Sequence, residues 1–83
     1  MRIRYFAWLK QRTGCAEEEL ELPDGVATVA DLLVLLGERH PRFGEAAKAD
    51  GVVRCAIDQT HAEGAASLAG AREVAFFPPV TGG

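Results

Sequence analysis

The residues with the clearest chemical potential form the end of the sequence, Phe-Phe-Pro-Pro-Val-Thr-Gly-Gly. Pro78 and Pro79 have no backbone N–H, so a strand must end at or before them, and they favour extended polyproline II structure. Gly82 and Gly83 lack Cβ atoms, so they fit a narrow channel. A frayed chain end is the alternative explanation. The prolines instead favour a tail that is stiff at its root and delivers the carboxylate of Gly83.

Transfer chemistry at Gly83 requires activation of its carboxylate. An α-carboxylate has a pKa near ~3.5, so it is ionised at neutral pH and does not react as an acyl donor. Condensation with ATP would give an acyl adenylate, and attack by a sulfur nucleophile would then give a thiocarboxylate. The sequence has neither a P-loop motif nor a G-x-G-x-x-G motif. We therefore expect this chain to bind no cofactor and a partner enzyme to bind the ATP.

Other reactive side chains show no pattern of a catalytic site. His40 and His61 have no Cys, Asp or Glu at metal-ligand spacing, so no metal site is predicted. Ser67 has no neighbours that mark it as a nucleophile. Cys15 and Cys55 do not form a C-x-x-C motif, and we expect two free thiols. A catalytic role for this chain alone is therefore not expected.

Length and charge narrow the class of protein. The chain has 83 residues, which favours one domain, and its net charge of -3 argues against nucleic acid as a partner. No apolar run approaches the ~20 residues that cross a membrane. Arg2 and Arg4 interrupt the apolar stretch near the N-terminus, which is unlike a signal peptide. We expect a cytoplasmic location.

Alternating apolar residues predict a strand over residues 2–9, with Ile3 and Tyr5 facing the core and Phe6 exposed. Thr28 is a good N-cap for a helix over residues 29–39, and Asp31 takes the capping-box position. The acidic run over residues 17–19 is interpreted as a solvated edge. Further elements are predicted as strands over residues 18–22, 52–57 and 71–77, and as a short helix over residues 43–49.

These elements predict an α+β fold. A mixed sheet packed on one main helix is the simplest way to bury the apolar stripe of that helix. We expect the first and last strands in the interior of the sheet, because both are rich in bulky apolar residues. This arrangement is the β-grasp of ubiquitin-like proteins. It assigns residues 1–77 to the domain and residues 78–83 to a flexible Gly-Gly tail.

The sequence closely resembles the MoaD family, the small, sulfur-carrying subunit of molybdopterin synthase. The specific signal is the ending Glu-Val-Ala-Phe-Phe-Pro-Pro-Val-Thr-Gly-Gly over residues 73–83. Tyr5-Phe6-Ala7 matches the aromatic-aromatic-Ala of the family's first strand. The helix capped by Thr28 and the turn at Gln59-Thr60 also agree, so the resemblance covers the whole chain.

The resemblance implies a sulfur carrier in molybdenum cofactor biosynthesis. A MoeB-like activating enzyme would use ATP to adenylate Gly83, which then becomes a thiocarboxylate. The tail would enter the active site of the large catalytic subunit, which is MoaE-like, and sulfur would pass to cyclic pyranopterin monophosphate. Two small and two large subunits form the family's heterotetramer. The inserted residues would be Pro79, Val80, Thr81 and Gly82.

Two questions stay open at this stage. Phe6 and Phe77 lie opposite the core positions and are candidates for the partner interface, although both could instead pack beneath a helix or loop. Three other functions also fit a Gly-Gly end: a sulfur carrier for thiamine thiazole synthesis, a ubiquitin-like modifier joined to lysines, and a plain interaction module.

Overall fold

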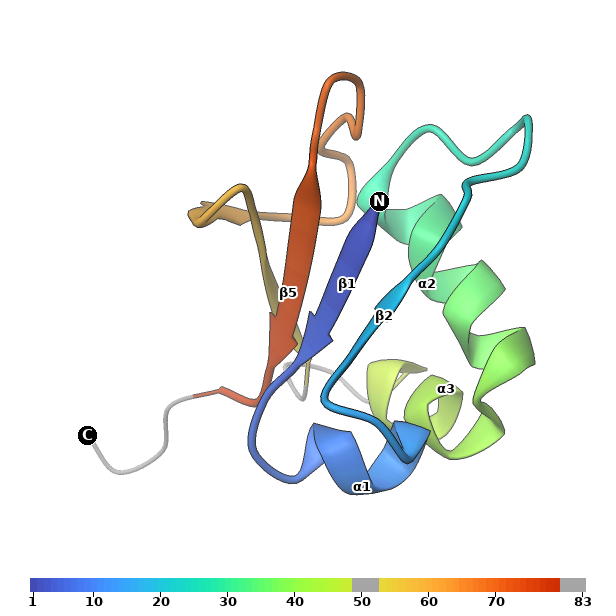
Figure 1. The fold of residues 1–83 in the computed structure, drawn as a ribbon, viewed down its shortest axis with the longest axis vertical. Helices are drawn as coiled ribbons and strands as arrows, with labels where there is room; N and C mark the ends of the chain where they lie inside the picture. The colour runs from blue at the N-terminus through green and yellow to red at the C-terminus, as the bar shows by residue number, and fades with distance from the viewer. Residues whose placement is uncertain (49–52, 80–83) are drawn as a thin grey trace.

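The computed structural model describes residues 1–48 and 53–79. Figure 1 shows a sheet with helices at one side and at one end. In chain order the elements are β1 (Arg2–Tyr5), α1 (Leu9–Thr13), β2 (Glu17–Glu19), α2 (Val29–Arg39), α3 (Pro41–Lys48), β3 (Arg54–Ile57), β4 (Thr60–Ala62) and β5 (Glu73–Phe77).

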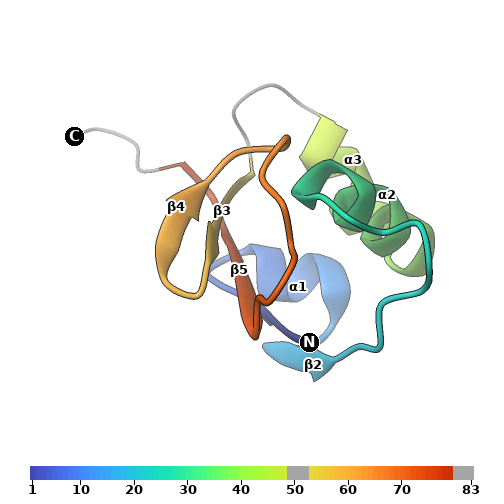
Figure 2. The same cartoon turned by 90° about the horizontal axis from the view of Figure 1, so that it is seen from above.

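The five strands form one mixed sheet in the order β2-β1-β5-β3-β4. β1 and β5 run parallel, and the other neighbouring pairs are antiparallel. The prediction that the first and last strands lie in the interior of the sheet is confirmed. Seen from above, α2 and α3 cover one face of the sheet (Figure 2). This is the β-grasp arrangement expected from the sequence.

The main helix, α2, has the bounds that the sequence predicts. Thr28 Oγ1 accepts a hydrogen bond from Asp31 N at 3.3 Å, and Asp31 Oδ2 accepts one from Thr28 N at 3.1 Å. This reciprocal capping box satisfies backbone donors that the first turn leaves without helical partners. Leu32 and Leu36 on the inner stripe of α2 are fully buried, each contributing about 1.5–3 kcal/mol relative to exposure.

The core joins the inner faces of β1 and β5 to the helices. Ile3 and Tyr5, both predicted to face the core, have exposed fractions of 0% and 1%. Three aromatic rings meet at its centre: the Tyr5 and Phe43 centroids are 5.3 Å apart and the Phe43 and Phe76 centroids are 5.4 Å apart, both edge to face. Aromatic pairs in this geometry add stabilisation beyond their buried area.

The prediction of a strand over residues 2–9 is wrong in its second half. β1 ends at Tyr5, and Ala7 then has a φ of 56°, in the left-handed region that breaks a strand. The chain turns into the short helix α1, where Leu9 is fully buried. The alternation of apolar residues predicted a longer strand because Leu9 is buried in the core, but Leu9 reaches the core from a helix at the end of the sheet.

Other boundaries also shift. β2 covers residues 17–19 rather than 18–22, although Leu20 and Leu22 are half-buried and pack against the core as expected. α3 begins at Pro41, whose fixed φ suits the first position of a helix. β4 was not predicted. It follows a tight turn in which Asp58 and Gln59 have φ values of 47° and 71°, so β3 and β4 form a hairpin.

The helices α2 and α3 touch through two glycines. A Cβ added to Gly44 would lie 2.9 Å from the Cα of Gly37, closer than real Cβ atoms approach. The absence of side chains at this crossing lets the two backbones meet and brings Phe43 into the core. Small residues at both positions are therefore a steric requirement of the fold.

We predict that Gly44→Ala lowers the free energy of unfolding by about 1–3 kcal/mol, because the helices must move apart to admit the methyl group. Gly64→Ala is the matched control, since its added Cβ would meet only the Ala30 Cβ at 3.8 Å, an ordinary contact. Urea unfolding of both variants makes the comparison. Equal stability of the two variants would contradict the proposed close contact.

Candidate functional site at the root of the tail

The root of the tail is held by strands on both sides. In the parallel register Tyr5 lies opposite Phe76, and the pairing extends one step further because Phe6 N donates to Phe76 O at 3.0 Å. On the other side Phe77 is paired with Arg54 of β3. Pro78 comes directly after this last paired residue, so the described chain leaves the sheet from a position fixed by two neighbours.

The side chains at the root alternate between the core and the surface. Phe76 is fully buried, Phe77 is half-buried, and the ring of Phe77 lies 6.3 Å from the ring of His61 on β4. Phe6 is 39% exposed at the neighbouring end of β1. These positions leave both side chains accessible in part; their role in binding a partner stays a prediction.

The structure describes the remaining predicted site residues only as far as Pro79. Pro78 and Pro79 are described and half-buried. The residues assigned to transfer chemistry and to insertion into a partner lie outside the described residues: Val80, Thr81, Gly82 and Gly83.

Two residues that sequence reasoning did not assign to a site lie beside the root. Trp8 is 38% exposed, and the guanidinium carbon of Arg12 lies 5.4 Å from the centre of its ring. The guanidinium carbon of Arg4 similarly lies 4.9 Å from the ring centre of Phe6. Both pairs are within the range of cation–π attraction. The sequence pattern places Trp8 on the outward face with Phe6, but its contact with Arg12 depends on α1, which was not predicted.

The cysteines do not form a sulfur-transfer site in the described structure. Both are free thiols, as predicted, and Cys55 Sγ donates to Ala62 O at 3.3 Å. Burial raises the pKa of the Cys55 thiol, which disfavours the nucleophilic thiolate. Among residues 1–48 and 53–79, no group of three metal-ligating side chains could hold an ion.

A polar cluster joins the edge strand β2 to the end of α2. Glu18 Oε2 accepts hydrogen bonds from Tyr5 Oη at 2.7 Å and from His40 Nε2 at 2.8 Å, and Glu18 Oε1 lies 3.3 Å from Arg39 NH2. The interpretation of residues 17–19 as a solvated edge is therefore wrong at Glu18, whose side chain is only 15% exposed. The Glu18 side chain points inward because the strand register pairs Glu18 with Ile3, which lies on the inner face of the sheet.

The titration of this cluster follows from its contacts. Burial by itself raises the pKa of Glu18, but hydrogen bonds from Tyr5 and His40 and the charge of Arg39 outweigh burial and leave that pKa below its ordinary value. Burial, together with the bond to Glu18, raises the pKa of the Tyr5 hydroxyl far above its ordinary value. Glu18 is thus a charged carboxylate held by hydrogen bonds from Tyr5 and His40, and the contacts of this cluster stabilise the fold.

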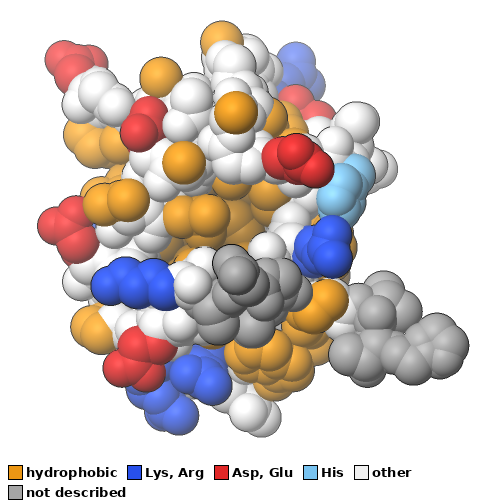
Figure 3. Space-filling model, turned by 180° about the vertical axis from the view of Figure 1, so that it is seen from behind, with side chains coloured by type: hydrophobic (Ala, Val, Ile, Leu, Met, Phe, Trp, Pro, Cys, Tyr) orange, Lys and Arg blue, Asp and Glu red, His pale blue; other side chains and the backbone are white. Residues whose placement is uncertain are grey.

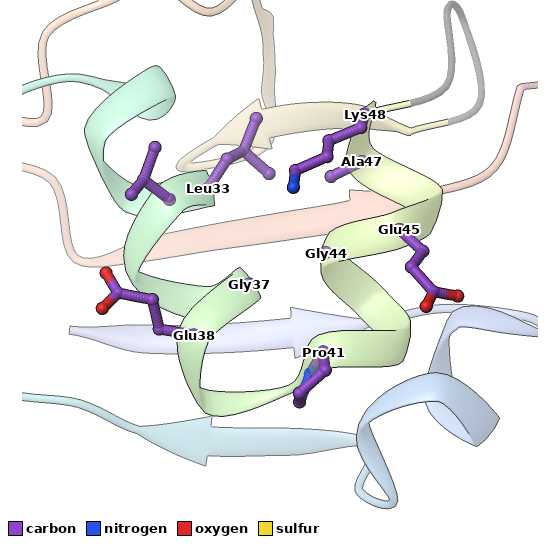
Figure 4. Close-up of a pocket in the computed structure, with 9 residues that line it drawn as sticks. Leu33, Gly37, Glu38, Pro41, Gly44, Glu45, Ala47 and Lys48 are labelled. Carbon is purple, nitrogen blue, oxygen red and sulfur yellow. The ribbon is translucent and has the colours of Figure 1, made fainter.

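Two surface hollows lie elsewhere on the domain. One lies between α2 and α3, with Leu33 and Ala47 along it (Figure 4). The other lies beside β3 and β4, with Val29, Cys55 and Phe76 among its lining residues; the face seen in Figure 3 is hollowed near its middle and lined there by apolar side chains. Cys55 and His61 both line the second hollow, but the Cys55 thiol donates to Ala62 O and burial raises its pKa, so it is not an activated nucleophile. The described structure therefore supports delivery of a tail more than catalysis in a pocket.

Fold and site together define a ubiquitin-like β-grasp protein with a strand-anchored C-terminal extension. The model of the ThiS family matches residues 3–83, and the chain belongs to that family. A search of curated protein sequences gives no match. The prediction of a small ubiquitin-like protein of the ThiS and MoaD type is confirmed.

Several solved structures share the fold over almost their whole length. SAMP1 from Haloferax volcanii is 29% identical with a TM-score of 0.81, over 99% of this chain and 97% of that one. A putative molybdopterin converting factor, subunit 1, from Pyrococcus furiosus is 32% identical with a TM-score of 0.76, over 95% of each chain. The chain therefore has the fold shared by sulfur carriers and protein modifiers, and it is a carrier rather than a catalyst.

Within the described residues no helix is long and apolar enough to cross a membrane.

We predict that Glu18 makes the stability of the domain depend on pH in acid. Because its pKa is lower in the folded than in the unfolded chain, its contribution is present above the ordinary value of 4.5 and is lost as pH falls below it. Urea unfolding of the native chain and of Glu18→Gln across this range should give stability curves that converge in acid. A stability difference that does not change with pH would contradict this account.

Proposed function

We propose that this chain is a sulfur carrier in molybdenum cofactor biosynthesis. A MoeB-like partner adenylates Gly83, sulfur replaces the adenylate to leave a thiocarboxylate, and this sulfur passes to cyclic pyranopterin monophosphate inside a MoaE-like catalytic subunit. The chain is the non-catalytic subunit of this sulfur transferase, in a heterotetramer with the large subunit. It binds no cofactor itself, since its partner holds the ATP, and it works in the cytoplasm.

The observation that carries the proposal is the anchoring of the tail root. Hydrogen bonding from Phe6 to Phe76 and pairing of Phe77 with Arg54 fix where the chain leaves the sheet. The two prolines that follow favour an extended path. A tail with this origin, which ends in Gly82-Gly83, suits insertion of residues 79–82 into a narrow active site while the domain stays outside.

The choice of pathway has a separate basis. The ending from Glu73 to Gly83 resembles the MoaD family, and the likeness to the putative molybdopterin converting factor subunit of Pyrococcus furiosus supports the same assignment. The likeness to SAMP1, a small archaeal modifier protein, favours one alternative, a modifier joined to lysine side chains. Both functions begin with adenylation of Gly83 and differ in the nucleophile that follows. A carrier for thiamine thiazole synthesis would share the thiocarboxylate but not the pyranopterin acceptor.

Mass spectrometry separates these outcomes. The chain is incubated with the purified activating enzyme, ATP and a sulfur donor, with the reaction lacking ATP as the control. We expect replacement of one oxygen by sulfur at Gly83. A covalent adduct to lysine would identify a modifier, and an unchanged mass in the complete reaction would contradict the proposal. Addition of the large subunit and cyclic pyranopterin monophosphate then tests for molybdopterin.

We predict that one extra residue after Gly83 abolishes carrier activity without changing stability. The added residue moves the terminal carboxylate away from the position that the activating enzyme requires, whereas the core ends at Phe76. Thiocarboxylate formation and thermal unfolding are measured on the same preparation. Normal activity in this extended variant would contradict the assignment of Gly83.

We predict that Phe77→Ala weakens binding of the large subunit more than it weakens the fold, because Phe77 is half-buried at the surface of the tail root. Phe76→Ala is the control, since Phe76 is fully buried and its truncation should cost about 3–5 kcal/mol. Titration calorimetry and thermal unfolding are compared for both variants. A comparable loss of stability in Phe77→Ala would place its ring in the core instead of the interface.

A further inference from the structure

The outward side of α2 carries apolar residues that the core covers only in part. Leu32 and Leu36 point inward and are fully buried, whereas Leu33, Val34 and Gly37 are half-buried or exposed. Val34 is 66% exposed. Because residues three and four positions apart are neighbours on a helix surface, these outward residues form one continuous patch.

This patch belongs to the hollow between α2 and α3 (Figure 4). The hollow has a volume of about 460 Å³, and Leu33, Pro41 and Ala47 are among its lining residues. Gly37 and Gly44, whose backbones meet at the helix crossing, also line it and bring no side chains to fill it. A hollow beside a contiguous apolar patch is typical of a surface that binds another protein.

The charged residues around the α2–α3 hollow lie at different positions on its border. In Figure 4 the Lys48 side chain extends from the end of α3 toward Leu33, while Glu38 and Glu45 lie on opposite sides, one on each helix. Among residues 1–48 and 53–79, no carboxylate lies within 4.0 Å of Lys48 Nζ, and no cation lies that close to Glu38 or Glu45. The border therefore carries both signs of charge, and an occupant must match both.

A second copy of the same hollow matches both signs. Rotation by 180° about an axis through the middle of the hollow would bring Lys48 of each copy to the Pro41 end of the other copy, between Glu38 and Glu45. The same rotation sets the apolar lining of one copy against that of the other, as in an isologous interface. An occupant of a single charge sign would instead place like charges against Lys48 or against the two carboxylates, which is unfavourable.

We propose that this chain forms a two-fold symmetric homodimer through the α2–α3 hollow. Val34 is its exposed apolar contact, and Lys48 of each copy is attracted to Glu38 and Glu45 of the other. The hollow is small, so the dimer is weak and dissociates on dilution. The inference goes beyond the proposed function and does not depend on it.

This dimer leaves the root of the tail accessible in both copies. α2 and α3 cover one face of the sheet (Figure 2), whereas Phe77 alternates with the buried Phe76 and faces away from these helices. Contact through the outward sides of the helices therefore does not cover Phe77. Both copies can present their tails at the same time.

The test measures the dissociation constant of the dimer by sedimentation equilibrium. Lys48→Glu, Glu45→Lys and Val34→Glu all change exposed residues of the hollow, and Arg72→Glu, at an exposed position just before β5, is the control that matches Lys48→Glu in net charge. Each change in the hollow should raise the dissociation constant about ten-fold or more, because a symmetric contact contains each residue twice, and the control should raise it less than about two-fold. Thermal unfolding checks that every variant is folded.

An equimolar mixture of Lys48→Glu and Glu45→Lys gives the sharpest readout. Each variant alone sets like charges against each other across the two-fold axis, whereas opposite charges face each other again in a mixed pair. The mixture should therefore return to within about three-fold of the native dissociation constant at low salt. A change in the fold or in net charge alone would not produce this recovery.

A native chain that stays monomeric up to about 1 mM would overturn the dimer. Dimers that are equally stable in Lys48→Glu, Val34→Glu and Arg72→Glu, or a mixture that is no more dimeric than its components, would overturn the choice of this surface. The proposed function is judged separately, because it fails only if Gly83 of the native chain acquires no sulfur in the complete reaction, whatever the state of association.

Discussion

The parallel pairing of β1 with β5 is the interaction on which the rest of the structure depends. It joins the two ends of the sequence in the interior of the sheet, and its last bond, from Phe6 N to Phe76 O, lies at the root of the tail. Tyr5 and Phe76, opposite each other in this register, share the aromatic centre of the core with Phe43. The energy that stabilises the fold therefore also fixes the origin of the tail.

The two faces of these strands serve different purposes. Ile3, Val74 and Phe76 point inward against α2 and α3, where burial stabilises the domain. The outward positions and the turn after β1 present partly exposed aromatic side chains near the tail, among them Phe6 and Trp8. Because surface and core positions occupy alternate residues of the same strands, changes at the proposed interface need not weaken the fold.

Much of the fold could be predicted from local signals. The Thr28 and Asp31 cap and the leucine stripe fixed the bounds of α2, and the alternation in Glu73–Phe77 identified the central strand. What could not be predicted depends on tertiary contacts: the positive φ of Ala7 that redirects Leu9, and the register that turns Glu18 inward. For the site, the tail was evident from its composition, whereas the contacts of Arg12 with Trp8 and with Arg42 O required α1 and α3 to be placed together.

Transfer of labelled sulfur tests the central claim most directly. Chain carrying radioactive sulfur at Gly83 is mixed with the large catalytic subunit and cyclic pyranopterin monophosphate, and label is followed in the protein and in the pterin. The account predicts that label leaves the chain and appears in molybdopterin, with an unlabelled carboxylate regenerated at Gly83. Label that stays on the chain, or molybdopterin that forms without it, would contradict the account.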